Sequence, residues 1–316
     1  LAMLLFYGIN SVFKLPFIEN IVSPSDIAVI HTLFNVFATA ALFPFGKILE
    51  KLACIIVKDS RSEGGETLVD KKFLISSSYA INKAMEECTK MGMIAKENIM
   101  LCLDFINEYS KINDERISEN EKLLDAYEDK LETYLVKINS MRLNLEDSVK
   151  MSKLTHAIGN FERIGDYGIN ILKTKRKMHQ NKIHFSSQAN DGLEVMSNAV
   201  SEIVEKSIQA FIDDDISLAK TIEPLEQVID NLKVELRAKH SKRIQNGECT
   251  VENGIMFFDI VNSFERIADH CSNIAVCIIE LSQNSFKPHS YLRVIKNDES
   301  KTFAEAFEKY LNKYKL

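Results

Sequence analysis

Apolar residues recur at spacings of three and four along most of the chain, which is the period of an amphipathic helix. The pattern predicts helices over residues 70–109, 114–140, 146–178, 190–212, 215–245, 250–283 and 301–314. Short polar clusters separate these segments, most clearly at Asp213-Asp214-Asp215 and Asn246-Gly247. Pro224 lies within one segment, and we expect that helix to kink or to start late. Because no strand pattern accompanies these segments, the fold is predicted to be all-α.

The first 57 residues have a different hydrophobic pattern from the rest of the chain. From Ile27 to Gly46, twenty residues carry no formal charge, and as a helix they would span about 30 Å, the thickness of the hydrocarbon core of a bilayer. This run predicts a last transmembrane helix at about residues 26–46. The Lys and Arg residues that follow place the C-terminal side in the cytoplasm by the positive-inside rule. The alternative is a buried core helix of a soluble protein.

Two residues with strongly polar side chains interrupt this apolar run. His31 and Asn35 lie four residues apart and therefore on one face of the predicted helix. Polar groups at membrane depth usually face a protein interior or a substrate path. The two side chains could thus line a transport path, or they could form hydrogen bonds between helices. The chain starts at Leu1 within an apolar run and without an initiator Met, and we expect an upstream membrane region to be missing.

A polar stretch with a Gly-Gly pair, residues 58–69, is predicted to link the membrane part to a helical part. The predicted organisation is the end of a membrane domain at 1–57, this linker, a first repeat at 70–180, a second repeat at 188–283, and a C-terminal extension with a short helix at 284–316. The expected location is the inner (plasma) membrane of a cell, with residues 58–316 in the cytoplasm.

An internal repeat carries the candidate chemistry. Residues 161–171 are FERIGDYGINI and residues 264–274 are FERIADHCSNI, so seven positions are identical at an offset of 103. A weaker match upstream relates a Glu-x-x-x-Asp at 121–125 to another at 226–230, at an offset of 105. Each half is therefore predicted to be a three-helix bundle, with one Glu-x-x-x-Asp pair on its second helix and another on its third.

The repeated pairs put like charges on one helix face. Residues four apart lie one above the other, and like charges there cost a few tenths of a kcal/mol. Carboxylates from two adjacent antiparallel helices can converge to offer oxygen ligands, which hard cations prefer. The alternative is a solvated charged face that binds nothing. The candidate metal ligands are Glu121, Asp125, Glu162, Asp166, Glu226, Asp230, Glu265 and Asp269.

Four further residues accompany the pairs on the third helices. Asn170 and Asn273 extend the same face by one turn and could add a carbonyl ligand or support the ligands by hydrogen bonds. Arg163 and Arg266 point elsewhere, and we expect them to form salt bridges between helices. A ferritin-like di-iron site is a further alternative, but its signature includes Glu-x-x-His. No His in this chain has an acidic residue three positions before it.

The two FERI(G/A)D copies resemble the signature of the PhoU family of phosphate-signalling proteins. The resemblance covers roughly residues 70–283. It implies two symmetric three-helix bundles whose E/D-x-x-x-D motifs bind metal clusters, here at the eight carboxylates named above, with iron, zinc, manganese or magnesium as the metal. The pair Glu121 and Asp125 matches least closely, because Glu128 and Asp129 offer a competing register.

The membrane part is similar to the end of bacterial sodium/phosphate cotransporters. The similarity lies in residues 30–35, Ile-His-Thr-Leu-Phe-Asn, and residues 42–45, Leu-Phe-Pro-Phe. It implies the C-terminal portion of a sodium-dependent phosphate symporter, with sodium as coupling ion and a PhoU-like domain that regulates phosphate uptake. The glutamine/serine-rich motifs of the transport core do not occur in this chain. The alternatives are a membrane-tethered PhoU-like regulator without transport activity, and an adaptor bundle that binds no metal.

Charge and motif content narrow the remaining function classes. The net charge of −6 argues against nucleic-acid binding, which needs a basic surface. No nucleophile–base arrangement, phosphate-binding Gly loop or Rossmann pattern is present, so the chain is predicted not to be an enzyme. The expected partners are the membrane, inorganic phosphate through the transport domain, and a second copy of the chain in a homodimer. Because the helical part is acidic, any contact with phosphate is expected to run through bound metal.

Overall fold

The structure is a computed structural model that describes residues 76–104, 109–282 and 301–316, together with Ile27, His31, Thr32, Asn35, Val36 and Thr39. The chain divides into two compact units, Leu1–Glu66 and Thr67–Leu316, and the boundary falls within the predicted linker 58–69.

The predicted transmembrane helix at about residues 26–46 lies largely outside the described residues. His31 and Asn35 are helical and exposed, and their role in a transport path stays a prediction. Among the residues that are described, no helix has the length and apolar character needed to cross a membrane.

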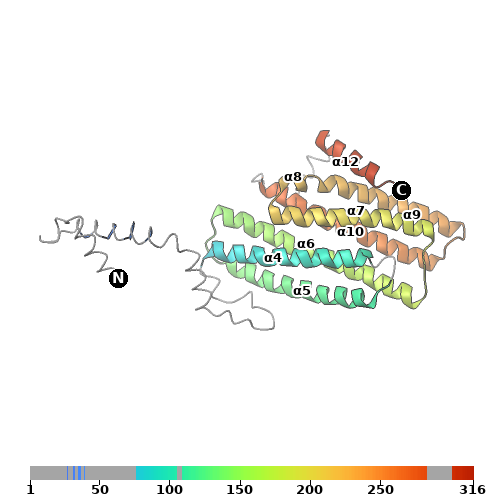
Figure 1. The fold of residues 1–316 in the computed structure, drawn as a ribbon, viewed down its shortest axis with the longest axis horizontal. Helices are drawn as coiled ribbons and strands as arrows, with labels where there is room; N and C mark the ends of the chain where they lie inside the picture. Colours follow the sequence, from blue (N-terminus) through green and yellow to red (C-terminus); the bar gives the residue numbers. More distant parts are fainter. Residues whose placement is uncertain are drawn as a thin grey trace. The chain divides into compact units, whose positions relative to one another are not determined.

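The second unit is built from helices alone wherever it is described (Figure 1). In chain order the helices are α4 (Ser77–Asp104), α5 (Lys111–Asn139), α6 (Leu145–Gln180), α7 (Ser187–Asp213), α8 (Ile216–Ala219), α9 (Ile222–Gln245), α10 (Val251–Ser282) and α12 (Lys301–Lys313). The all-α prediction is therefore confirmed for this part of the chain.

Several helices begin where a short polar side chain accepts a hydrogen bond from a free backbone N–H, and some end at or near a residue with a positive φ. The side chain of Asn144 accepts a hydrogen bond from the backbone N–H of Asp147, which starts α6. At the predicted Asp213–Asp215 break, Asp214 ends α7 in the left-handed conformation with a φ of 52°. Gly247, with a φ of 74°, follows the end of α9. Pro224 lies in the first turn of α9. Of the two predicted outcomes, a kink or a late start, the helix therefore shows the late start.

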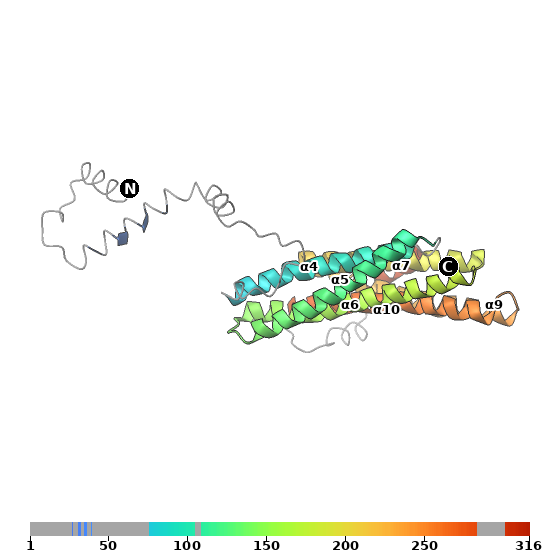
Figure 2. The same ribbon diagram turned by 90° about the horizontal axis from the view of Figure 1, so that it is seen from below.

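The long helices form two three-helix bundles. Helices α4, α5 and α6 pack on one another, and so do α7, α9 and α10. The main contact between the bundles is made by their third helices, α6 and α10, with α4 also touching α7 (Figures 1 and 2). Helix α12 packs on α9. The interface of α6 with α10 therefore brings the two repeated motifs close together.

The repeat is present in the core as well as in the sequence. Phe161 and Phe264, at equivalent positions, are both 0% exposed. Phe161 makes an edge contact with Phe211 of α7, with ring centroids 5.2 Å apart. Each FERI segment thus anchors the third helix of its bundle by burying the same aromatic side chain. The buried Phe fixes the rotation of the helix, and with it the direction in which the acidic residues of the segment point.

Candidate functional site

Five carboxylates from α5 and α6 form what we call the acidic face: Glu121, Asp125, Glu128, Glu162 and Asp166. Glu121 and Glu128 both have a raised pKa, first because of partial burial and then because of neighbouring carboxylates. For Glu121 these neighbours are Asp125 on its own helix and Asp166 on α6. The first-repeat carboxylates of the two helices therefore lie close enough to repel one another.

Glu162 is the most strongly affected of these carboxylates. Burial raises its pKa to about 7, with further contributions from Asp166 and from Glu128 across the interface, and with Arg163 opposing the rise. A carboxyl group with this pKa is partly protonated at neutral pH unless a cation compensates it. The acidic face thus holds more negative charge than its surroundings neutralise.

The second repeat arranges its four predicted carboxylates differently. Glu226 and Asp230 lie on α9, and Glu265 and Asp269 on α10. Lys233 lies between the two helices, with its Nζ 2.9 Å from Oε1 of Glu265 and 3.6 Å from Oδ1 of Asp230. Glu265 is only 8% exposed, so this ion pair neutralises a nearly buried charge. The second-repeat site already contains a cation of its own.

The repeat explains the difference between the two sites by a single substitution. Lys233 lies 105 residues after Glu128, which is the offset between α5 and α9. Glu128 raises the pKa of Glu162, and Lys233 pairs with Glu265, the equivalent of Glu162. Glu128 therefore adds a fifth carboxylate beside the pair Glu121 and Asp125. The choice between this pair and the competing register at Glu128 and Asp129 stays a prediction.

The expected salt bridges of Arg163 and Arg266 between helices are not formed among the described residues, and that expectation was wrong. Nη1 of Arg163 lies 3.4 Å from Oδ2 of Asp166, and Nη1 of Arg266 lies 3.2 Å from Oδ2 of Asp269. Each arginine thus pairs with the carboxylate one turn ahead on its own helix, because a spacing of three residues brings the two side chains together. Both guanidinium groups are more than half exposed.

Asn170 and Asn273 are exposed. Asn170 lines a neighbouring cleft together with residues of α9 and α10, and the role of both asparagines in supporting metal ligands stays a prediction. His270 donates a hydrogen bond of 2.9 Å from Nδ1 to Oδ1 of Asn160. Its ring also stacks on Tyr167, the equivalent residue of the first repeat. The pseudo-symmetric centre of the α6–α10 interface therefore lies between these two rings.

The candidate ligands do not form a closed coordination site. In the part of the chain that the structure describes, no three His, Cys, Asp or Glu side chains gather in a way that could hold a metal ion. The acidic face nevertheless offers oxygen donors, unneutralised charge and partial exposure, which fit a hard cation. The second-repeat site fits one less well because Lys233 competes for the same carboxylate oxygens.

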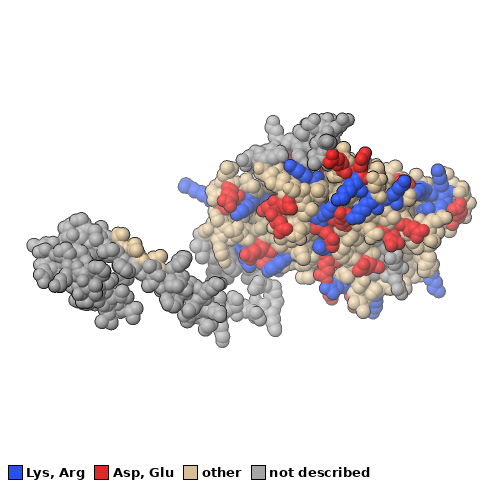
Figure 3. Space-filling model, turned by 45° about the horizontal axis from the view of Figure 1, so that its top comes forward, with Lys and Arg blue, Asp and Glu red and all other residues tan. Residues whose placement is uncertain are grey.

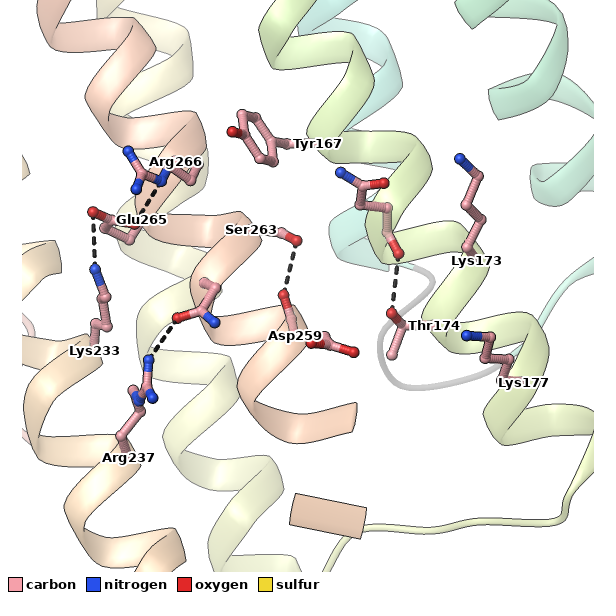
Figure 4. A pocket seen from close by; sticks show the side chains of 12 residues that line it. Tyr167, Lys173, Thr174, Lys177, Lys233, Arg237, Asp259, Ser263, Glu265 and Arg266 are labelled. Carbon is pink, nitrogen blue, oxygen red and sulfur yellow. Dashed lines mark hydrogen bonds and ion pairs between the residues drawn. The ribbon is translucent and has the colours of Figure 1, made fainter. Parts of the chain in front are cut away.

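Beside the second-repeat site lies a cleft that the sequence did not predict, with a volume of about 610 Å³. Figure 4 shows Lys173 and Lys177 of α6 on one side, Lys233 and Arg237 of α9 on the other, and residues of α10 between them. Arg266 adds a fifth cation. We call this the basic cleft. The face in Figure 3 likewise shows Lys and Arg side chains gathered beside groups of Asp and Glu, so the surface charge is uneven.

Comparison with known protein families gives a match in each bundle. The model of the PhoU domain family matches residues 88–174 and 193–278. The accessory protein PhoU homolog 1 of the phosphate-specific transport system of Thermotoga maritima is 24% identical over 215 residues, covering 67% of this chain and 84% of that protein. The PhoU homolog of Zymomonas mobilis is 27% identical over 187 residues, covering 59% of this chain and 78% of that protein.

Two solved structures share the fold. The crystal structure of PhoU from Pseudomonas aeruginosa superimposes with a TM-score of 0.63 at 16% identity, over 66% of this chain and 100% of that one. The phosphate transport system regulatory protein PhoU from Streptococcus pneumoniae gives a TM-score of 0.60 at 17% identity, over 66% and 98% of the two chains. The two bundles of α4–α10 therefore have an architecture already known from crystals.

Proposed function

Because the chain belongs to the PhoU domain family, we propose that it is a regulatory accessory protein of phosphate transport. The observation that carries this proposal is the match of the family model to both three-helix bundles, with the acidic motif repeated on the third helix of each. The relatives compared above are named as accessory or regulatory proteins of phosphate transport systems. The partner proposed for this chain is accordingly a phosphate transporter in a membrane.

Membership of this family confirms the prediction that the chain is not an enzyme, since its relatives are regulatory accessory proteins. The regulatory role is tested in cells that lack the gene and in cells complemented with the chain. Phosphate uptake is measured before and after a shift from scarce to abundant phosphate. We expect the deletion to change how uptake responds to the shift, and the chain to restore that response. A response that is the same with and without the gene would contradict the proposal.

The acidic face is the part of the regulator that we propose to bind a metal ion. Its support is the surplus of negative charge at Glu121, Glu128 and Glu162, each of which has a raised pKa. With Asp125 and Asp166 these residues would hold iron, zinc, manganese or magnesium, and the ion would add positive charge to that of Arg163 and Lys173. Binding at the second-repeat site stays a prediction from the family resemblance.

The metal content of the purified chain tests this proposal. Mass spectrometry should find a transition metal or magnesium in the unmodified chain, and the double variant Glu162→Ala/Asp166→Ala should lose most of it. The matched double variant Glu265→Ala/Asp269→Ala, at the equivalent positions, should keep it. Equal loss in both variants would show that the two sites bind alike. Metal content unchanged in the first variant would exclude the acidic face.

The finer prediction of a sodium-coupled transporter fused to this domain depends on residues 1–57, most of which lie outside the described residues. Its supporting observation is the uncharged run from Ile27 to Gly46. Sodium-dependent phosphate uptake by cells that express the complete reading frame, in a strain without other phosphate transporters, tests it. Uptake that is independent of sodium would leave the regulatory role as the sole proposal.

A further inference from the structure

The basic cleft concentrates positive charge in a protein that is acidic overall. Its walls carry five cationic side chains against two carboxylates, a net charge of +3, whereas the whole chain has a net charge of −6. The cations come from three helices and from both repeats, since α6 belongs to the first and α9 and α10 to the second. No single helix face accounts for this concentration, because only the packing of α10 against both α6 and α9 produces it.

The internal repeat allows the charge of the cleft to be compared with the charge at the equivalent positions. The offsets of 103 and 105 assign an equivalent to each lining residue, and four of the five cations have a neutral or acidic counterpart. The pairs of cleft residue and counterpart are Lys173 and Val276, Lys177 and Glu280, Lys233 and Glu128, and Arg237 and Glu132. With Glu162 and Arg163 included, the counterparts carry a net charge of −3. The cleft and its pseudo-symmetric counterpart, each made of residues from both repeats, therefore carry opposite net charge.

Several of these cations are available to a ligand. Lys173 and Lys177 are exposed, and neither forms an ion pair with a carboxylate in the described part of the chain, although the charge of Lys173 also opposes the rise in the pKa of Glu121. Arg237 donates a hydrogen bond of 3.0 Å from Nη1 to Oδ1 of Asn262 and lies over the ring of Phe258, and among the described residues it forms no ion pair with a carboxylate. Lys233 and Arg266 share Glu265 between them.

The shape and the donors of the cleft indicate the chemistry of its ligand. A volume of about 610 Å³ exceeds what a single orthophosphate needs and lies within the range of pockets for small organic ligands. Guanidinium and ammonium groups on opposite walls are the usual recognition groups for phosphoryl oxygens. We propose that the basic cleft binds a small soluble polyanion that carries at least two phosphoryl groups. This site is distinct from the acidic face, and it would stand even if that face binds no metal.

Calorimetric titration of the purified chain, with pyrophosphate and ATP as probes, tests the proposal. Both should bind, and orthophosphate should bind at least about tenfold more weakly, because it can reach only one wall. The double variant Lys177→Ala/Arg237→Ala removes one cation from each wall. It should lower the affinity for pyrophosphate and for ATP at least tenfold. A tenfold change is about what the loss of one or two charge-assisted hydrogen bonds costs. Citrate, a polyanion without phosphoryl groups, should bind no better than orthophosphate.

A matched double variant separates the cleft from general charge effects. Lys137→Ala/Arg142→Ala removes the same charge from exposed positions outside the cleft and should leave the affinities unchanged. Circular dichroism checks that both variants are folded. Failure of pyrophosphate and ATP to bind the unmodified chain, or equal weakening by the two double variants, would overturn the proposal. So would citrate binding as tightly as ATP.

A last measurement distinguishes a soluble ligand from a lipid headgroup. The chain is sedimented with phosphatidylglycerol vesicles, with and without pyrophosphate. We expect no sedimentation that depends on Lys177 and Arg237. Sedimentation that the double variant abolishes, and that pyrophosphate does not displace, would assign the cleft to a membrane surface and contradict the soluble ligand.

Discussion

The two repeats share their buried residues and differ in the charge of the surface beside them. At the core positions, Phe161 corresponds to Phe264 and Ile164 to Ile267, and all four side chains are 0% exposed. At the interface of the second and third helices, however, Glu128 corresponds to Lys233. One repeat therefore has an acidic face with raised pKa values, and the other has an internal ion pair beside a basic cleft.

This comparison shows how a duplicated fold can acquire two binding preferences. The buried positions are constrained by packing, because a change of volume there costs several kcal/mol. At the helix interface, the equivalent residues Glu128 and Lys233 are both partly exposed. A negative or a positive side chain is therefore compatible with the same backbone at this position. A change of charge at that position adds or removes a neutralising partner for the carboxylate opposite. The difference between the repeats thus depends on few residues, and it can be exchanged experimentally.

The largest expected effect comes from giving the second repeat the residue of the first. Lys233→Glu removes the 2.9 Å ion pair of Glu265 and places a like charge beside a side chain that is 8% exposed. The free energy of unfolding should fall by about 1–3 kcal/mol. This is less than the loss of a fully buried ion pair would cost, because Arg266 and solvent still partly neutralise Glu265. Chemical denaturation of the purified chain measures it.

The reciprocal variant completes this exchange. Glu128→Lys gives the acidic face the cation that the second repeat already has, so it should leave the stability unchanged or raise it by up to about 1 kcal/mol. It should also abolish metal binding at the acidic face. If both variants destabilise the chain equally, the charge difference between the repeats is not what distinguishes them.

The second expected effect is a pH dependence that belongs to one repeat. The pKa of Glu162 is raised from 4.5 to about 7 in the folded chain, so the folded state holds this proton more tightly than the unfolded state. Its contribution to stability is fully present below about pH 4.5 and is lost as the pH rises through about 7. With metal removed by a chelator, the unfolding free energy should fall across this window by about 1–2 kcal/mol.

Variants at equivalent positions of the two repeats show which carboxyl group causes this pH dependence of the unfolding free energy. Urea denaturation at pH 5 and pH 8 should give a smaller difference for Glu162→Gln than for the unmodified chain. Glu265→Gln, the same change in the other repeat, should retain the difference because Glu162 is still present. Stability that rises between these pH values, or a slope unaltered by Glu162→Gln, would show that the acidic face does not carry this proton.

The helices and the repeat could be predicted from the sequence because both depend on local periodicity. For example, the predicted segment 146–178 corresponds to α6 at Leu145–Gln180. The eight carboxylates could likewise be named from the repeat, although which of them lack a neutralising partner depends on Lys233. The exchange of Glu128 for Lys233 is visible in the aligned repeats, but its meaning required the contact with Glu265.

The basic cleft could not be predicted in the same way. Its cations lie on three separate helices, since Lys173 and Lys177 are on α6, Lys233 and Arg237 on α9, and Arg266 on α10. Each is an ordinary residue within its own helix, and the net charge of the chain conceals them. Only the packing of α10 against α6 and α9 makes one surface of them. The pairing of Arg163 with Asp166, in contrast, follows from a spacing of three residues and could have been predicted.

The smallest expected effect concerns the centre of the pseudo-symmetric interface. Asn160 binds Nδ1 of His270 across the α6–α10 contact at 2.9 Å, whereas its equivalent, Ser263, donates only to the backbone oxygen of Asp259 on its own helix. Asn160→Ala should lower the free energy of unfolding by about 0.5–1.5 kcal/mol, the usual net value of one hydrogen bond. Ser263→Ala should cost less than about 0.5 kcal/mol, because the hydroxyl's acceptor is already bonded within the helix. Thermal denaturation of the two variants under identical conditions measures both. Equal costs would show that the repeats contribute equally at this centre, and that the hydrogen bond to His270 does not hold α6 and α10 together.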